Sequence, residues 1–207
     1  MNNKVNIAVL VSGGGTNLQA LIDAEKSGIL KNGEIKLVVS SNENAYALKR
    51  AQDAGIKTVV CEKSDRSQKE FEKSISSALR GADIELIILA GFMSILSADF
   101  IGDYPDRIIN VHPSLIPSFC GKGFYGLRVH RAALEYGVKV TGATVHFVNE
   151  IPDGGRIIMQ KAVDIRESDT PESLQKRVME GAEWVILPLS AERVCRKIKE
   201  EKANECV

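Results

Sequence analysis

The sequence predicts an α/β fold of the Rossmann-like class: a mostly parallel twisted sheet with helices on both faces and an antiparallel strand pair near the C-terminus. Three observations support this prediction. Several short runs, such as Val5 to Val11, are apolar at nearly every position, as in strands covered on both faces. These runs alternate with segments of helical spacing. Two later extended segments are joined by one loop, which favours an antiparallel pair.

Strands and helices alternate through the first half, which indicates parallel strands with right-handed crossovers. Leu18, Leu21 and Ile22 have helical spacing, and Gly28 suits a helix end. Ser40-Ser41-Asn42 offers N-caps for a helix that reaches about Ala54. The expected strands are 5–11, 35–39, 57–61, 85–90 and 107–111, and the other expected helices are 16–28 and 68–79.

The second half changes character. Segments 141–148 and 156–163 read as strands, and segment 127–134 has a helical pattern. The last long helix begins near Thr170 as N-cap with Pro171 at its first position, and Pro188 predicts a break or a fresh helix start. We find no linker or repeat, so we expect one domain over 1–207, with halves of about 1–105 and 106–207.

Bulk properties restrict the function. The 207 residues carry 27 basic and 27 acidic side chains, and this zero net charge argues against a protein that mainly grips nucleic acid. No apolar run approaches the roughly 20 residues that span a bilayer, so we expect no membrane partner. The start lacks the apolar segment of a signal peptide, so we expect a cytoplasmic location. The four scattered cysteines read as free thiols.

The run Ser12-Gly13-Gly14-Gly15-Thr16-Asn17 follows the first strand and opens the first helix. A dinucleotide fingerprint needs a third glycine where Leu18 stands, and a triphosphate loop needs a lysine that is missing here. A short anion-binding loop remains, in which N–H groups of Gly14, Gly15, Thr16 and Asn17 face one phosphate monoester. The alternative is a plain glycine turn.

Polar residues end a strand in the second half. Asn110 and His112 lie two apart, so they face the same way at the edge where α/β sheets bind ligands. A histidine moves protons near neutral pH, and an amide N–H holds an oxyanion. Asp153 orients His112 if the two meet, although an aspartate before two glycines is also ordinary turn chemistry. His146 is either a supporting partner behind this group or a core histidine.

Five motifs stand in one order along the chain and together resemble the phosphoribosylglycinamide formyltransferases, folate-dependent enzymes of purine synthesis. The motifs are Ser12–Ala20, Leu89–Met93, Asn110–Pro117, Thr144–Val148 and Asp153–Gly155. The resemblance implies the formyltransferase fold and transfer of a formyl group from 10-formyltetrahydrofolate to the amine of glycinamide ribonucleotide. It implies no metal, and small molecules as partners. The oligomeric state, monomer or homodimer, stays open.

The resemblance also implies roles for particular residues. The catalytic trio of the family is matched by Asn110, His112 and Asp153. Its phosphate loop is matched by Gly15, Thr16 and Asn17. Glu183 matches a position that contacts the nucleotide. The implied folate-binding residues are Met93, Ser94, Ile95, Leu96, Asn149, Glu150, Ile151 and Pro152. Ser94 departs from the family, where arginine is common. The long loop Ser118–Gly126 is either a mobile lid or an inert insertion.

Three rivals are weighed. A methionyl-tRNA formyltransferase would need a further RNA-binding domain and a basic balance. A formyltetrahydrofolate hydrolase uses the same trio but normally has an N-terminal regulatory domain, for which there is no room before Val5. A non-catalytic phosphate- or nucleotide-binding module of Rossmann-like type explains the glycine loop but leaves Asn110, His112 and Asp153 without a role.

Overall fold

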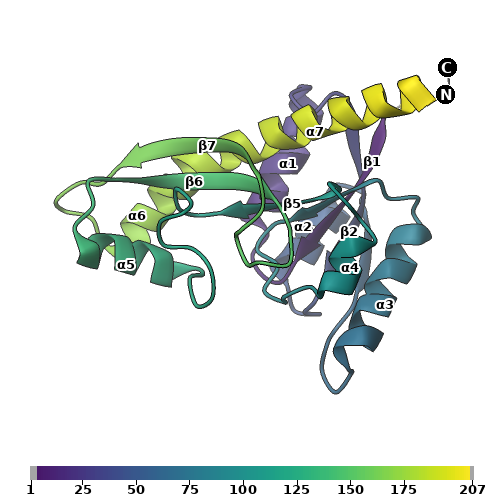
Figure 1. Cartoon of the computed structure of the whole chain (residues 1–207), viewed down its shortest axis with the longest axis horizontal. Coiled ribbons are helices and arrows are strands. Elements are labelled where there is room, and N and C mark those ends of the chain that lie inside the picture. The colour runs from purple at the N-terminus through teal and green to yellow at the C-terminus, as the bar shows by residue number, and fades with distance from the viewer. Residues whose placement is uncertain (1–3, 206–207) are drawn as a thin grey trace.

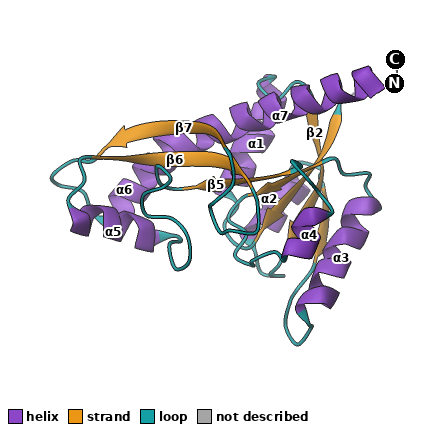
Figure 2. Cartoon of the chain, viewed as in Figure 1, coloured by secondary structure: helices purple, strands orange, loops and turns teal. Residues whose placement is uncertain are grey.

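A computed structural model describes residues 4–205. Its seven-stranded sheet has the order β3-β2-β1-β4-β5-β6-β7. The strands from β3 to β5 pair parallel with their neighbours, and β6 pairs antiparallel with both β5 and β7. Figures 1 and 2 show β6 and β7 extending away from the parallel part. The strands are β1 (Val5–Val11), β2 (Gly33–Ser40), β3 (Lys57–Val60), β4 (Leu86–Leu89), β5 (Ile108–His112), β6 (Val140–Phe147) and β7 (Ile157–Asp164).

Helices cover both faces of the sheet, as predicted. One core packs α1, α2, α6 and α7 against the sheet through residues such as Leu21, Ala47 and Leu187. The opposite core packs α3 and α4 through Phe71, Ile75 and Phe100. The helices are α1 (Thr16–Ser27), α2 (Tyr46–Asp53), α3 (Gln68–Arg80), α4 (Ala98–Gly102), α5 (Leu127–Tyr136), α6 (Pro171–Val178), the π-helical turn η1 (Met179–Glu183) and α7 (Trp184–Glu205).

The N-cap prediction for α2 is wrong. The helix starts at Tyr46 with Ala45 as its N-cap, and that residue makes no side-chain capping bond. The Ser40 hydroxyl and the Asn42 backbone instead bond to each other in a local turn, and the Ser41 hydroxyl bonds to that of Ser12. The hydrogen bonds of these short polar side chains stabilise a turn in place of a helix, so α2 begins four residues after Asn42.

The prediction for Pro188 is also wrong, because Pro188 lies inside α7 and no break occurs there. The helix instead widens just before it: in η1 the N–H of Trp184 bonds to the carbonyl of Met179. Trp184 is the residue whose carbonyl a proline four positions later would strike in a regular helix. A π turn at this place gives the backbone room for the ring. The predicted caps Thr170 and Pro171 are confirmed in α6.

The parallel strands end at one edge of the sheet, where the glycine loop, the segment after β4 and the end of β5 meet. The Met93 N–H donates to the Ser12 hydroxyl, which in turn contacts the hydroxyl of Ser41. The glycine loop and the segment after β4 are therefore joined at this edge. Cys61, Cys120 and Cys195 are free thiols as predicted, and Cys206 lies outside the described residues. Within residues 4–205, no helix is long and apolar enough to cross a membrane.

Candidate active site

Strand pairing positions the polar cluster. Ile109 and Val111 belong to the core under α1 and α7, so the alternate residues Asn110 and His112 face the other side of β5. The antiparallel register sets His146 of β6 directly opposite Asn110. The Asn110 amide nitrogen lies 3.3 Å from Nε2 of His146. Two strands far apart in sequence thus supply three polar side chains to one place.

Asp153 reaches this cluster from the loop between β6 and β7. One carboxylate oxygen lies 3.4 Å from Nδ1 of His112, and the other lies 3.6 Å from Nε2 of His146. Asp153 has a φ of 57° in the left-handed region, which aspartate tolerates better than most residues. The Gly121 N–H donates to the same carboxylate over 2.8 Å. The conditional prediction that Asp153 meets His112 is confirmed.

His112 has an acceptor at each ring nitrogen. Its Nε2 lies 2.9 Å from the Phe119 carbonyl, which only accepts, so Nε2 carries the proton, and Nδ1 faces the Asp153 carboxylate. This geometry suits the imidazolium. Burial, however, lowers the pKa of His112 below its ordinary value, although Asp153 and the Phe119 carbonyl act in the opposite direction. In this conformation the balance favours the neutral ring at pH 7.

Asp153 stays ionised in the same site. Burial acts to raise the pKa of Asp153, but His146, the charge of His112 and the Gly121 N–H together hold it below the ordinary range. His146 donates from Nδ1 to the Phe147 carbonyl over 2.8 Å, which fixes its ring orientation. The structure therefore places His146 against both Asn110 and Asp153.

The loop Ser118–Gly126 lies over the trio. The Phe119 carbonyl contacts His112, and Gly121 donates to Asp153. The Phe119 ring packs edge-on against Phe124 and against Tyr136 of α5. Phe119 and Gly121 of this loop thus touch two members of the trio, and the choice between a lid and an inert insertion stays a prediction.

The glycine loop has the geometry of an anion site. Gly15 is the N-cap of α1 at φ 71° and no side chain caps the helix, so the first N–H groups of α1 have no side-chain acceptor. A Cβ on Gly15 would lie 2.6 Å from that of Ala47, so only glycine lets α2 approach. Arg50 of α2 donates to the Gly14 carbonyl over 2.9 Å. Sequence reasoning missed this cation, because it stands far down the chain in another helix.

The Asn17 side chain faces inward. Its amide donates to the Glu183 carboxylate over 2.7 Å, and its own oxygen is buried without a partner among the described residues. The resemblance places Asn17 at the phosphate loop, but in this structure its side-chain amide is bonded to Glu183. Burial raises the pKa of Glu183, while the hydrogen bond from Asn17 opposes the shift. The structure thus joins two residues that the sequence predicted separately, at the start of α1 and in the π turn.

The segments expected to hold folate differ in exposure. Met93, Ile95 and Ile151 are 58%, 72% and 61% exposed, whereas Leu96 is buried in the core. An open groove of about 460 Å³ is lined by Lys63, Gln68, Met93, Ser94, Ile95, Leu96 and Ser97. Within residues 4–205, no hydrogen bond joins residues 93–96 to residues 149–152; Asn149 instead accepts from the N–H of Ile151 in its own loop.

His130 of α5 is fully buried, and neither of its ring nitrogens has a hydrogen-bond partner in the described chain. Burial, aided by the charge of His112, lowers its pKa to about 4. It is therefore a neutral imidazole that packs beside the site. Between residues 4 and 205, no group of three or more histidine, cysteine or acidic residues is placed to hold a metal ion.

Comparisons with known proteins identify the family of this chain. The formyl transferase family matches residues 5–189. A trifunctional purine biosynthetic protein adenosine-3 of Gallus gallus is 47% identical over 180 residues, which are 86% of this chain and 17% of that protein. A phosphoribosylglycinamide formyltransferase of Escherichia coli is 38% identical, over 89% of this chain and 84% of its own.

A solved structure, glycinamide ribonucleotide transformylase 1 from Symbiobacterium toebii, superposes with a TM-score of 0.88 at 37% identity. The match covers 95% of this chain and 90% of that one. The chain belongs to the formyl transferase family. The resemblance carried by the sequence motifs is confirmed, and so is the fold that it implied.

Proposed function

We propose that this chain transfers the formyl group of 10-formyltetrahydrofolate to the primary amine of glycinamide ribonucleotide, a step of purine (IMP) biosynthesis. The observation that carries the proposal is the contact of Asp153 with His112 and His146 beside Asn110, at the sheet edge that also holds the uncapped glycine loop. A relative and a structural neighbour that align over most of their own length are named for this reaction.

The trio handles the charge and the protons of the transfer. The substrate amine forms a bond to the formyl carbon, and the amide oxygen gains negative charge. Asn110 donates to that oxygen, and the Nε2–H of His112 donates to it instead of to the Phe119 carbonyl. Such donors contribute about 2.7–4 kcal/mol each. The carbon–N10 bond then breaks, and a proton passes from the amine to N10 with Asp153 and water as the relay. The products are the formylated ribonucleotide and tetrahydrofolate.

The 5′-phosphate of the ribonucleotide fits the glycine loop. Backbone N–H groups of Gly14, Gly15, Thr16 and Asn17 are its donors, and the Thr16 hydroxyl is half-buried beside them. Arg50 adds positive charge, because its guanidinium bonds to the Gly14 carbonyl. Glu183 contacts the nucleotide from the π turn, and the Asn17 amide fixes the position of the Glu183 carboxylate.

The folate co-substrate supplies the formyl carbon when it binds. The chain fits its flat, partly apolar ring, because Met93, Ile95 and Ile151 leave large apolar side chains exposed in the two expected segments. Polar backbone near Ser94, Asn149, Glu150 and Pro152 reads the edge of the ring. The groove beside Met93 contains Lys63, whose ammonium suits a carboxylate on the outer part of the folate now that serine replaces the arginine common at position 94.

A spectroscopic formyl-transfer assay tests the proposal. Wild type and His112→Ala are given 10-formyl-dideazafolate with and without glycinamide ribonucleotide. We expect folate product only when the ribonucleotide is present, and a loss of 10²-fold or more in the variant. Thr16→Val serves as a second variant, in which the KM for the ribonucleotide rises more than kcat falls. Circular dichroism confirms that each variant is folded.

Other outcomes select the rivals. Product without the ribonucleotide identifies a formyltetrahydrofolate hydrolase, and saturable phosphate binding without any turnover identifies a binding module. The cytoplasmic location stays a prediction, as does the choice between a monomer and a homodimer.

A further inference from the structure

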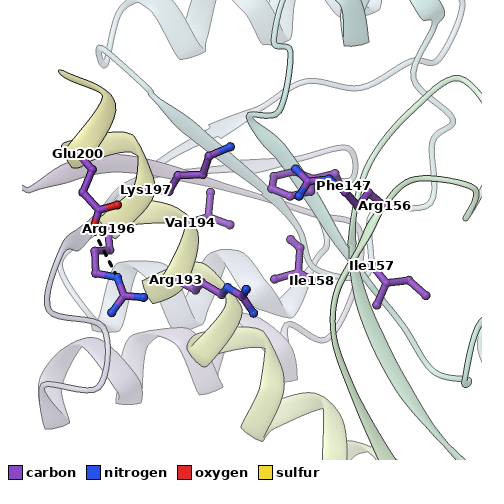
Figure 3. Close-up of a pocket in the computed structure, with 9 residues that line it drawn as sticks. All are labelled: Phe147, Arg156, Ile157, Ile158, Arg193, Val194, Arg196, Lys197 and Glu200. Carbon is purple, nitrogen blue, oxygen red and sulfur yellow. Dashed lines mark ion pairs between the residues drawn. The ribbon is translucent and has the colours of Figure 1, made fainter. Parts of the chain in front are cut away.

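A groove separate from the candidate active site lies between the long C-terminal helix and the start of β7. It encloses about 270 Å³ (Figure 3). Its floor includes Phe147 and Val194 of the core under α1 and α7, which is the face of the sheet opposite to the His112 side chain. The lining residues are Phe147, Arg156, Ile157, Ile158, Arg193, Val194, Arg196, Lys197 and Glu200.

The groove concentrates positive charge in a protein whose net charge is zero. The lining contains four cationic side chains and one carboxylate, that of Glu200. The cations are Arg193, Arg196 and Lys197 of α7 and Arg156 beside β7. Figure 3 shows Arg193 and Lys197 extending from the helix toward the strand side, where Arg156 lies. Side chains from two elements therefore present cations to the same space.

Neighbouring carboxylates neutralise these cations only weakly. The contacts of Arg156 with Asp106 and of Arg196 with Glu200 are 3.7 and 3.8 Å long between exposed side chains, and such pairs contribute little in water. Lys197 shares Glu201 with Arg107, which holds that carboxylate more closely. Arg193 has no ion pair within the described part of the chain. The groove therefore keeps a surplus of positive charge.

Pairs within the helix account for Arg196 and Lys197, which lie four residues before Glu200 and Glu201, but not for Arg193. Arg193 and Lys197 are four residues apart on one face, where like charges destabilise a helix by about 0.2–0.5 kcal/mol per pair. Both stand in the middle of α7 (Trp184–Glu205), so they gain nothing from the negative end of the helix, whose effect is confined to the last turn. A bound anion would offset this repulsion.

The size and chemistry of the groove restrict the class of ligand that it can bind. Its volume lies just below the roughly 300–1,000 Å³ typical of pockets for drug-sized ligands, so a compact molecule fits. The Phe147 ring is already covered by the Arg156 guanidinium at 4.7 Å, so it offers no free face for a nucleobase. An arginine guanidinium can donate two parallel N–H bonds to the oxygens of one phosphate. Charge, rather than ring stacking, therefore governs recognition.

We propose that this groove binds a compact phosphorylated small molecule with at least two negative charges, held by Arg156, Arg193 and Lys197. The site does not depend on the reaction proposed above. It connects to the catalytic loop through the backbone, because the Arg156 carbonyl accepts from Phe147 only three residues after Asp153.

Calorimetric titration of the full chain with pyrophosphate, in buffer free of divalent cations, tests this site. The groove variant is Arg193→Gln with Lys197→Gln, which keeps good helix formers. The matched control is Lys57→Gln with Lys139→Gln, which removes the same charge from two exposed positions outside the groove. Thr16→Val identifies binding at the glycine loop. Inorganic phosphate and ribose 5-phosphate are titrated in parallel.

We expect saturable binding by wild type and by the control, unaffected by Thr16→Val and weakened at least tenfold in the groove variant. Pyrophosphate should bind more tightly than inorganic phosphate. Equal binding by the groove variant, loss of all binding in Thr16→Val, or no saturable binding by wild type would overturn the proposal. So would an acidic peptide that binds through Arg193 and Lys197 while pyrophosphate does not, because the site would then serve a protein partner.

Discussion

At the scale of single residues, His112 is subject to opposing influences. Its burial disfavours the charged ring, while the Asp153 carboxylate at 3.4 Å favours it. The Phe119 carbonyl accepts from Nε2 of His112 in this structure. A substrate oxygen must replace that carbonyl as the acceptor. The proton at Nε2 is thus already aimed at the place where an oxyanion would form. Asp153 decides how much of the ring is charged when it does.

Asp153→Asn should therefore lower the pKa of His112 further and reduce kcat by about 10²-fold or more, because the protonated ring becomes scarcer at neutral pH. The surviving activity should move toward lower pH. Imidazole NMR titration of His112 and a pH–rate profile measure the two effects. Asp164→Asn, at an exposed carboxylate of β7, is the matched control. An unchanged profile in Asp153→Asn would remove the proposed role of the carboxylate.

His130 makes stability depend on pH. Its pKa is about 4 in the folded chain against 6.5 ordinarily, so between these values the unfolded chain binds more protons. Above pH 6.5 His130 is neutral in both states and has no effect on the pH dependence of stability. As the pH falls toward 4, protonation of the unfolded chain lowers the free energy of unfolding by about 3 kcal/mol in total. His130→Leu should leave stability near neutral pH similar and flatten this acid loss. Urea unfolding at pH 7, 5.5 and 4.5 measures it, and an unchanged acid slope would contradict the assignment.

At the scale of elements, the sequence patterns predict buried strands and long helices well. β1, β4 and β5 lie within one residue of their expected bounds, because a doubly covered strand is mostly apolar. The five-residue α4 and the π turn were missed, since the first is too short for periodicity and the second depends on packing around Pro188. Contacts such as Phe119 with His112 depend on a loop path that no local pattern specifies.

Gly155 lets the two strands of the hairpin that carries Asp153 approach each other. A Cβ on Gly155 would lie 1.7 Å from the Phe147 carbonyl, so Gly155→Ala must push the start of β7 away from β6. We expect a loss of about 1–3 kcal/mol of stability together with reduced activity, because Asp153 moves with the strand. Gly102→Ala, which has open space around it, is the control. Urea unfolding and the formyl-transfer assay measure both effects. A Gly155→Ala protein as stable as the control would contradict this account.

At the scale of the whole molecule, the two halves of the chain are joined by polar contacts as well as by the sheet. Asn17 bonds to Glu183 across 166 positions of sequence. Asn32 bonds to Glu192 and to Lys199. In each contact, one partner lies in the C-terminal helical segment. That segment also completes the core under α1, through residues such as Leu187 and Val194.

The proposed single domain over 1–207 should therefore unfold in one transition. Trp184 is the only tryptophan and adjoins the buried Glu183, so its fluorescence reports on the contact between the halves, whereas far-UV circular dichroism reports on all helices and strands. The two urea midpoints should coincide. Glu183→Ala leaves Asn17 without its partner and should lower the free energy of unfolding by about 1–3 kcal/mol, so that both midpoints fall together. If the fluorescence midpoint alone fell, the C-terminal helix would be separating from a first half that stays folded, and two units would replace one.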